Sequence, residues 1–323
     1  MPTILVTGAF GQIGTELTQA LYSRYGAENV LATGRRVPES AGTLAGPVET
    51  LDVTDPAGLQ EVCARHDVEI IYHLAARLSA VAEQDPLEAW RINVDGLRNV
   101  LETARAASVK RLFWPSSIAV FGPETPRTLT PQDTVTRPTT VYGIAKVAGE
   151  LLCDYYVRRY GLDARGVRYP GVISSGALPG GGTTDYAVEI FYAAVQTGRY
   201  TAFVREDCQL PMIYMPDCVR AALQLMDADR EALVHRSGFN INAMSFSAGE
   251  LAAEIRKHIP DFLCDFHPDE RQQIADSWPD SLDDGAARRE WGWQPSYDLE
   301  TMTADMLSKL RARPLSGHKE TAR

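Results

Sequence analysis

The hydrophobic positions in the first half of the chain form short runs that alternate with helical patterns. Most of these runs are continuously apolar, which is typical of strands buried on both faces of a parallel sheet. Between them lie segments with the 3.6-residue period of helices. This alternation predicts a doubly wound α/β fold, with helices on both faces of a parallel sheet. The expected strands lie at 4–6, 30–33, 48–51, 70–74, 111–114 and 165–169, and the expected helices include 55–66, 86–107 and 141–160.

The second half has a different pattern from Tyr169 onward. A stretch rich in Gly, Ser and Pro at 174–184 leads into an amphipathic helix that ends near Gly198. Shorter strands and helices follow, which indicates a smaller lobe beside the main sheet. The helices expected there lie at 216–227, 247–259 and 299–311.

Composition narrows the classes of function. The 323 residues include 42 acidic and 32 basic side chains, and the net charge of −10 disfavours a nucleic-acid partner. The five cysteines are widely spaced and form no Cys-x-x-Cys pair, so we expect neither a disulfide framework nor a zinc site. An apolar strand follows Met1 almost at once, and no apolar run approaches about 20 residues, so we expect no leader and no membrane span. These features predict a cytoplasmic protein.

A glycine-rich turn lies between the first strand and the first helix. Glycines at this place let the backbone approach a pyrophosphate, whose charge sits against the free N–H groups of the helix. Two later strands end in residues that suit the same ligand, a carboxylate for the adenine edge and small residues beside the cofactor. The motif therefore predicts dinucleotide binding, and a plain tight turn is the alternative. The residues concerned are Gly8, Phe10, Gly11, Gln12, Ile13 and Gly14, then Asp52 and Val53, then Leu74, Ala75 and Ala76.

A second motif pairs a tyrosine with a lysine. Tyr142 and Lys146 are four residues apart and lie on one face of a predicted helix. A neighbouring ammonium and an oxidised nicotinamide would lower the phenol pKa and favour a base. Ser116 and Ser117 end the fifth strand and offer a hydroxyl at the same edge of the sheet. The alternative is an ordinary amphipathic helix with a half-buried Tyr and a surface Lys.

Together these motifs resemble the extended short-chain dehydrogenase/reductase superfamily. Thr7, His73 and the pair Asn93-Val94 belong to the same set, which covers about the first 170 residues. Later segments are similar to the short-chain type of L-threonine 3-dehydrogenase and extend the resemblance over nearly the whole chain. They lie at 114–122, 168–171, 180–187, 210–217 and 276–279.

The resemblance implies a division of the chain into two units. Residues 1–171, with return segments around 212–243, would form an NAD-binding Rossmann domain. Residues 172–211 and 244–312 would form the substrate-binding lobe. The polar tail at 313–323 is expected to fray.

The resemblance also implies a reaction, the NAD-dependent oxidation of L-threonine at C3 to 2-amino-3-oxobutanoate in threonine catabolism. Tyr142 would act as the general base while hydride passes to nicotinamide C4. Lys146 would hold the phenolate and the nicotinamide ribose, and Ser117 would bind the substrate oxygen. Asn93 and Tyr169 would add to the cofactor site.

A homodimer is a further expectation from the resemblance. The two helices at 86–107 and 141–160 would pair across a two-fold axis. Apolar positions at helical spacing on the first of them fit such a face, although core packing uses the same pattern. These positions are Leu97, Val100, Leu101 and Ala104.

The charged end of L-threonine requires partners of its own. Thr183 and Thr184 precede a predicted helix, and their hydroxyls with the free N–H groups there suit a carboxylate. Ser79 would meet either charged group, Asp185 would pair with the ammonium, and Trp278 would cover the pocket. Helix capping, a loop serine and a core aromatic are the structural alternatives for these residues.

The position that selects the cofactor departs from the family pattern. NAD-dependent members usually end the second strand with Asp or Glu, which accepts hydrogen bonds from the adenine ribose. Here that position is Gly34, followed by Arg35 and Arg36. Guanidinium groups suit a 2′-phosphate, and solvated loop charges are the alternative. We expect NAD as the cofactor, with Arg35 beside it and with measurable use of NADP.

Two other functions stay open. A nucleotide-sugar epimerase or dehydratase would share the first half, but only Arg199 and Arg205 are basic between 172 and 216, which disfavours a sugar diphosphate. A non-catalytic NAD(P)-sensing protein would not need Tyr142 and Lys146. The histidines show no metal spacing, and the chain has no Gly-x-Ser-x-Gly motif, so we expect neither a metal site nor an acyl-enzyme.

Overall fold

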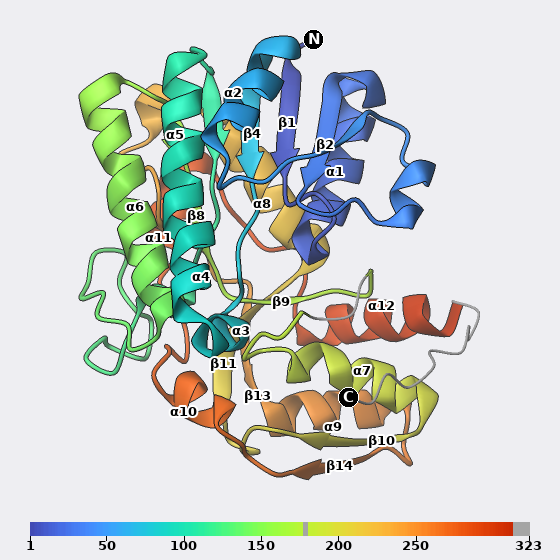
Figure 1. Ribbon diagram of the computed structural model, residues 1–323. Coiled ribbons are helices and arrows are strands. Elements are labelled where there is room, and N and C mark those ends of the chain that lie inside the picture. Colours follow the sequence, from blue (N-terminus) through green and yellow to red (C-terminus); the bar gives the residue numbers. More distant parts are fainter. Residues whose placement is uncertain (177–179, 313–323) are drawn as a thin grey trace.

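The computed structural model describes residues 1–176 and 180–312, and its centre is a six-stranded parallel sheet (Figure 1). The strand order is β3-β2-β1-β4-β5-β7, which reverses direction at β1 and confirms the predicted doubly wound α/β fold. The strands are β1 (Thr3–Thr7), β2 (Val30–Gly34), β3 (Val48–Thr50), β4 (Val68–His73), β5 (Arg111–Phe113) and β7 (Ala164–Arg165).

Helices cover both faces of this sheet because successive strand residues point to opposite sides. In β1, Leu5 joins the core under α2, α5 and α6, whereas Ile4 and Val6 join the core under α1 and α8. The helices are α1 (Gln12–Tyr25), α2 (Pro56–Arg65), α5 (Gly96–Ala106), α6 (Val141–Tyr160) and α8 (Met215–Asp227). The α8 helix comes from the second half of the chain and packs against α1.

The residues predicted to form the dimer face are wrong. Leu97, Val100, Leu101 and Ala104 are fully buried in the core between α5 and the sheet. They cannot contact a second copy, and their helical spacing reflects core packing.

The helix expected at 86–107 is interrupted by a wider turn. It consists of α4 (Pro86–Trp90), the π-helical turn η3 (Arg91–Asp95) and α5. Asn93 lies in that turn, and its side-chain amide accepts from the backbone N–H of Arg77 at 2.8 Å and donates to the Arg77 carbonyl at 3.0 Å. Asn93 therefore fixes the loop that follows β4.

The strand expected at 165–169 divides at Gly166. After β7, the chain forms β8 (Val167–Tyr169), which pairs with β6 (Ser116–Ser117) and β12 (Phe239–Asn240) in a separate small sheet. The backbone N–H of Gly166 donates to the Arg236 carbonyl at 2.9 Å, and a side chain at 166 would overlap the Trp114 carbonyl oxygen. The close approach of the Trp114 backbone thus ends the main sheet here.

A buried ion pair ties this edge of the sheet to α8. The guanidinium of Arg165 has no exposed surface and donates two hydrogen bonds to the carboxylate of Asp163, at 2.9 and 2.7 Å. It also donates to the carbonyls of Leu225 and Ala228 at the end of α8, at 2.6 and 2.8 Å.

The remaining elements form a smaller part with its own core, drawn below the main sheet in Figure 1. A three-stranded sheet, β13-β11-β9, and the pair β10-β14 are covered by helices. The strands are β9 (Gly171–Ile173), β10 (Arg199–Ala202), β11 (Gln209–Tyr214), β13 (Met244–Ser247) and β14 (Leu263–Phe266). The helices are α7 (Tyr186–Gln196), α9 (Ala248–His258), α10 (Arg271–Asp276) and α12 (Leu299–Ala312).

Short elements connect these parts: α3 (Ser79–Gln84), α11 (Gly285–Trp291), η1 (Ala27–Asn29), η2 (Glu39–Thr43), η4 (Ile118–Val120) and η5 (Arg230–Ala232). The tail at 313–323, which was expected to fray, lies outside the described residues. Within the described ranges, the helices are too short or too polar for any of them to cross a bilayer.

Candidate active site

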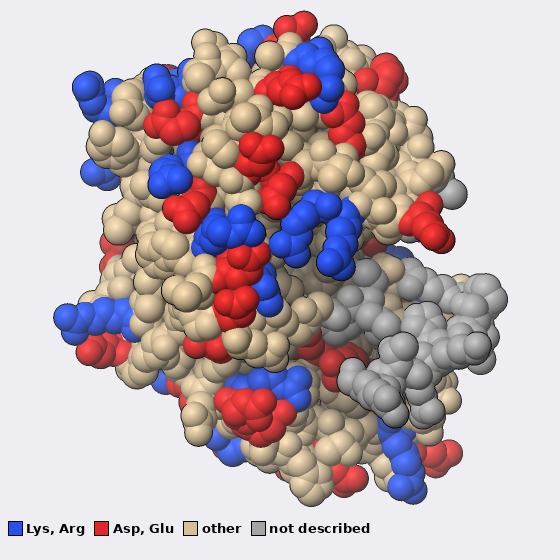
Figure 2. Space-filling view, in the orientation of Figure 1, with Lys and Arg blue, Asp and Glu red and all other residues tan. Residues whose placement is uncertain are grey.

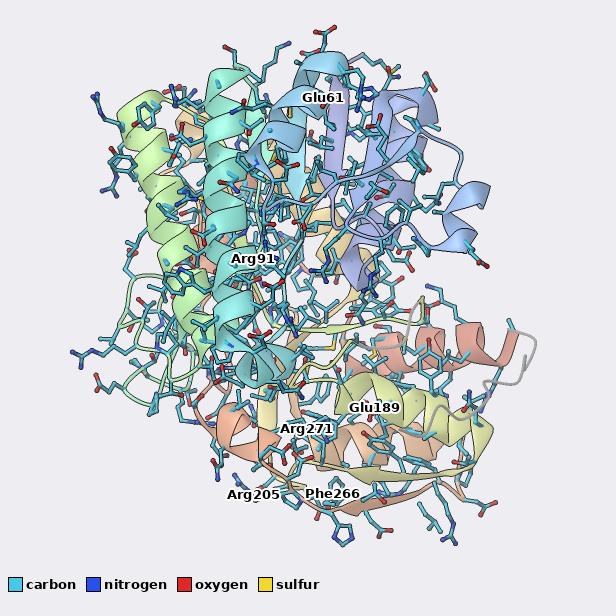
Figure 3. The ribbon with its side chains drawn as sticks, in the orientation of Figure 1. Glu61, Arg91, Glu189, Arg205, Phe266 and Arg271 are labelled. Carbon is cyan, nitrogen blue, oxygen red and sulfur yellow. The ribbon has the colours of Figure 1, made fainter. Side chains whose placement is uncertain are left out.

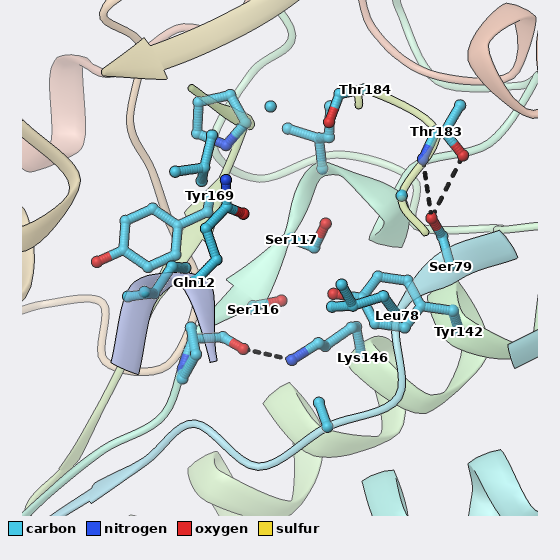
Figure 4. Close-up of a pocket in the computed structure, with 18 of the residues that line it drawn as sticks. Gln12, Leu78, Ser79, Ser116, Ser117, Tyr142, Lys146, Tyr169, Thr183 and Thr184 are labelled. Carbon is cyan, nitrogen blue, oxygen red and sulfur yellow. Dashed lines mark hydrogen bonds between the residues drawn. The ribbon is translucent and has the colours of Figure 1, made fainter. Parts of the chain in front are cut away.

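A cavity of about 240 Å³ lies at the carboxyl ends of the central strands, between the main sheet and the smaller part (Figure 4). Side chains from the glycine turn, β6, α6 and the loop before α7 all face it. The predicted site residues that line it are Gly8, Gly11, Gln12, Ile13, Gly14, Leu74, Ala76, Ser79, Ser117, Tyr142, Lys146, Tyr169, Thr183, Thr184 and Asp185. Trp278 also lines it.

A second cavity of similar volume adjoins the first along the glycine turn and the end of β4. It holds the remaining predicted cofactor residues at the adenine end, which are Arg35, Asp52, Val53 and Ala75. Phe10 and Asn93 line neither cavity. Phe10 packs beside Gly34, and Asn93 acts through the Arg77 loop.

The glycine turn has the shape that a pyrophosphate requires. Gly8 has a φ of +72°, and a Cβ there would lie 2.6 Å from the backbone nitrogen of Ala75. A Cβ on Gly14 would overlap the carbonyl oxygen of Gly8. The helix α1 begins after Gly11 without a side-chain cap, so its first N–H groups point to the cavity as donors for an anion. These residues fit a dinucleotide.

Tyr142 and Lys146 lie one turn apart on α6, whose first turn is capped by Thr140. Burial raises the pKa of Tyr142 to about 12, and the Ser117 hydroxyl opposes this shift. Burial lowers the pKa of Lys146 to about 7. Since burial disfavours the charged form of both groups, a positive charge beside the ring is needed to favour the phenolate.

The ammonium of Lys146 is held by its surroundings in this structure. Its Nζ donates to the Pro115 carbonyl at 2.6 Å, lies 4.5 Å from the centre of the Trp114 ring and 5.5 Å from the centre of the Tyr142 ring. A dashed line in Figure 4 marks this hydrogen bond of Lys146.

The two serines at the end of β6 differ in their environment. Ser116 donates to the buried carboxylate of Glu150 at 2.6 Å, and Arg168 pairs with the same carboxylate through two hydrogen bonds, at 2.9 and 2.8 Å. The Ser117 hydroxyl accepts from the Ala119 N–H at 3.2 Å and lies beside Tyr142. Both serines line the cavity, but the Ser116 hydroxyl donates to Glu150, so Ser117 is the one whose hydroxyl is available as a donor to a ligand.

The far wall of the cavity carries the predicted substrate groups. The Ser79 hydroxyl lies 3.3 Å from the Thr183 hydroxyl and accepts from the Thr183 N–H at 3.3 Å. Asp185 accepts from the N–H groups of Gly181 and Gly182, at 2.8 and 2.6 Å, through one carboxylate oxygen. Burial raises the pKa of Asp185 to about 6. The wall thus offers hydroxyls and one carboxylate to a small polar ligand.

Sequence reasoning missed part of the wall. Leu78, Ile118 and Pro170 to Val172 also line the cavity. Most contribute apolar surface or backbone, for which no residue type is diagnostic. Among residues 1–176 and 180–312, no cluster of three or more His, Cys, Asp or Glu has the arrangement of a metal site.

Comparisons with known proteins agree with this geometry. Residues 4–242 match the model of the NAD dependent epimerase/dehydratase family. An uncharacterised epimerase/dehydratase of Staphylococcus haemolyticus is 49% identical over 97% of this chain and 99% of its own.

Two solved structures are similarly related. L-threonine dehydrogenase from Clostridium difficile is 52% identical, with a TM-score of 0.93 over 96% of this chain and 98% of that one. A monomeric L-threonine 3-dehydrogenase from a metagenome database is 48% identical, with a TM-score of 0.93 over 96% of this chain and 99% of that one. These structures confirm the predicted resemblance and support an NAD-dependent oxidoreductase. The chain belongs to the NAD-dependent epimerase/dehydratase family.

Proposed function

We propose that this protein oxidises L-threonine at C3 to 2-amino-3-oxobutanoate, with NAD as the hydride acceptor. The observation that carries the proposal is the meeting of Tyr142, Lys146 and Ser117 in one cavity, between a dinucleotide cradle and a polar wall. Similar structures at about half identity are threonine dehydrogenases, which supports this substrate.

The described residues divide the work of binding along the two cavities. The glycine turn and the start of α1 would hold the pyrophosphate, and Asp52 with Val53 would hold the adenine end. NAD, when bound, supplies a carbon that accepts hydride and a positive charge beside Tyr142. Lys146 would exchange the Pro115 carbonyl for the nicotinamide ribose and keep the phenolate stable.

The proton and the substrate oxygen fall to this chain's own side chains. Tyr142 would take the C3 hydroxyl proton as hydride leaves C3, and the Ser117 hydroxyl would donate to the developing alkoxide. Thr183, Thr184 and Ser79 would bind the substrate carboxylate, and Asp185 the ammonium.

A sugar-diphosphate substrate fits the cavity less well. Among the described residues that line it, Lys146 is the one basic side chain. Arg205 pairs with Asp276 at 2.7 Å, and Arg199 is exposed on β10. A dianionic ligand would therefore find no counter-charge beyond the catalytic lysine.

The test is an assay in which the purified chain is mixed with NAD and one candidate substrate at a time. The absorbance of the reduced cofactor measures the reaction. We expect reduction with L-threonine, and little with L-serine, D-threonine or buffer alone. Conversion of a nucleotide sugar without net reduction would instead identify an epimerase. Binding of cofactor without turnover of any substrate would identify a sensing protein.

We also propose a cytoplasmic location. All five cysteines are free thiols, four of them buried and one partly buried, which fits a reducing compartment.

Asp185→Asn is expected to raise KM for L-threonine about 10-fold near neutral pH, with kcat nearly unchanged, because an ion pair with the ammonium is lost. Since the pKa of Asp185 is raised to about 6, its carboxyl is charged above that pH and neutral below it. The wild-type KM should therefore rise as pH falls through 6, and the variant should lack this rise. Asp207→Asn, an exposed acid of the same part, is the control. Equal KM values for Asp185→Asn and wild type would assign Asp185 to the loop alone.

We also propose a homodimer through the outer faces of α4 and α6, where large apolar side chains are exposed: Leu87, Trp90, Ile144, Leu151 and Tyr155. Leu151, which is 65% exposed, lies on this face. Leu151→Arg is expected to convert a particle of twice the chain mass into one of 35.5 kDa, as measured by light scattering. Val234→Arg, at another exposed apolar position, should change nothing. A wild-type mass of 35.5 kDa would contradict the proposal and would make this protein a monomer, as the metagenome enzyme is described to be.

A further inference from the structure

The adenine end of the cofactor site lacks the usual acceptor for ribose hydroxyls. The last residue of β2 is Gly34, where NAD-binding folds usually place a carboxylate. A Cβ on Gly34 would lie 2.8 Å from Cδ2 of Phe10 and 3.1 Å from Cε2, so the Phe10 ring occupies the space of a side chain there. Nothing at this position repels an additional negative charge on the ribose.

A guanidinium stands next to this gap. Arg35 lines the adenine-end cavity together with Asp52, and its side chain is 55% exposed. Its ion pair among the described residues is a single contact of 3.4 Å with Glu88. Glu88 has a closer partner in Arg91, which donates to its two carboxylate oxygens at 2.7 and 2.8 Å. Arg35 therefore keeps most of its donors for a ligand.

Asp52, the carboxylate that lines this cavity, uses one of its two oxygens within the protein. One of its oxygens accepts from both the N–H and the hydroxyl of Thr54, at 2.9 and 2.8 Å. Arg91 donates to the same Thr54 hydroxyl at 2.6 Å and so lies at the same end. Figure 2 shows Lys and Arg side chains gathered in the middle of the face of the molecule that it displays. Figure 3, in the same orientation, labels Arg91 there.

We propose that this end of the site binds a ribose 2′-phosphate, with Arg35 as its main partner and Glu88 as the carboxylate that the phosphate displaces. The inference rests on the proposed function in one respect, that the two cavities hold a nicotinamide dinucleotide. A planar guanidinium donates two parallel hydrogen bonds to phosphate oxygens, which is stronger than one contact with an exposed carboxylate. The protein would then accept NADP as well as NAD.

The experiment measures binding without any reaction, using 2′,5′-ADP and 5′-AMP as probes in titration calorimetry at low salt. The two probes differ in the 2′-phosphate alone. We expect wild type to bind 2′,5′-ADP more tightly than 5′-AMP. Because no threonine is present, this result does not depend on whether the protein oxidises it. Equal or weaker binding of 2′,5′-ADP would overturn the proposal.

Two variants move the affinity in opposite directions. Arg35→Ala should weaken the binding of 2′,5′-ADP about 10-fold or more and leave the binding of 5′-AMP within about 3-fold. Glu88→Gln removes the competing carboxylate and should strengthen 2′,5′-ADP alone. The control is Arg98→Ala, which removes an exposed arginine of α5 that pairs with Asp95. Equal weakening of both probes by Arg35→Ala would show that Arg35 contacts the adenine or pyrophosphate, which also overturns the proposal.

Discussion

Replacing Tyr142 with Phe is expected to lower kcat for L-threonine oxidation by at least about 100-fold and to leave NAD affinity nearly unchanged. The phenyl ring fills the same space on α6, but it has no oxygen to take the C3 hydroxyl proton. Lys146 and Ser117 stay in place and cannot replace it, because the Lys146 amine is held by the Pro115 carbonyl away from the substrate oxygen and the serine hydroxyl is a weak base. The effect should therefore appear in kcat rather than in cofactor binding.

The matched control is Tyr160→Phe, since Tyr160 lies on the same helix, is exposed and is outside the proposed dimer face. Steady-state kinetics gives kcat for both variants, and titration with NAD gives their cofactor affinity. Tyr142→Phe turnover above about 10% of wild type would mean that another group takes the proton, because loss of a general base costs about 100-fold or more. It would then remove Tyr142 from the role of base.

Replacing Arg165 with Met is expected to lower the free energy of unfolding by about 3–5 kcal/mol. The methionine has similar length, but the buried carboxylate of Asp163 loses both hydrogen bonds from Arg165 and keeps only the more distant Arg111, at 3.9 Å, as a counter-charge. The carbonyls of Leu225 and Ala228 also lose their donor, so β7 and the end of α8 separate. The loss falls on the edge of the main sheet formed by β7.

Chemical denaturation of the purified variant measures this loss. Arg158→Met serves as the control, because Arg158 is 83% exposed and pairs with Asp154 at only 3.9 Å. Its change should be about 0–1 kcal/mol. A loss below about 1 kcal/mol for Arg165→Met would show that water or backbone movement satisfies the buried groups.

Much of the fold follows from local hydrophobic pattern. Strands buried on both faces are continuously apolar, and this pattern predicted the central strands and the helices between them. The interruptions of the strand expected at 165–169 and of the helix expected at 86–107 were not predictable, because their causes are distant in sequence. Gly166 ends β7 owing to the Trp114 backbone, and the π turn at 91–95 carries an amide that binds the Arg77 loop.

The candidate site shows the same division. Motif residues at strand ends, such as Gly8 and Tyr142, reach the cavity because parallel strands end at one edge. The different environments of Ser116 and Ser117 depend on Glu150, which lies on α6. No spacing in the sequence indicates that Glu150 contacts Ser116. The dimer face was assigned to the wrong side of α5, because helical spacing alone does not say which apolar stripe is covered.

Because Lys146 lies above the Trp114 indole, the fluorescence of this tryptophan should report on the state of the site. An ammonium 4.5 Å from a ring perturbs the excited state of the indole, and Trp114 is buried and held against Gly149. When Lys146 turns from Pro115 toward a bound ribose, the emission of this tryptophan should change in intensity and wavelength. Comparison with Trp114→Phe would isolate that signal from the other four tryptophans. Stopped-flow fluorescence would then follow cofactor arrival without any added label.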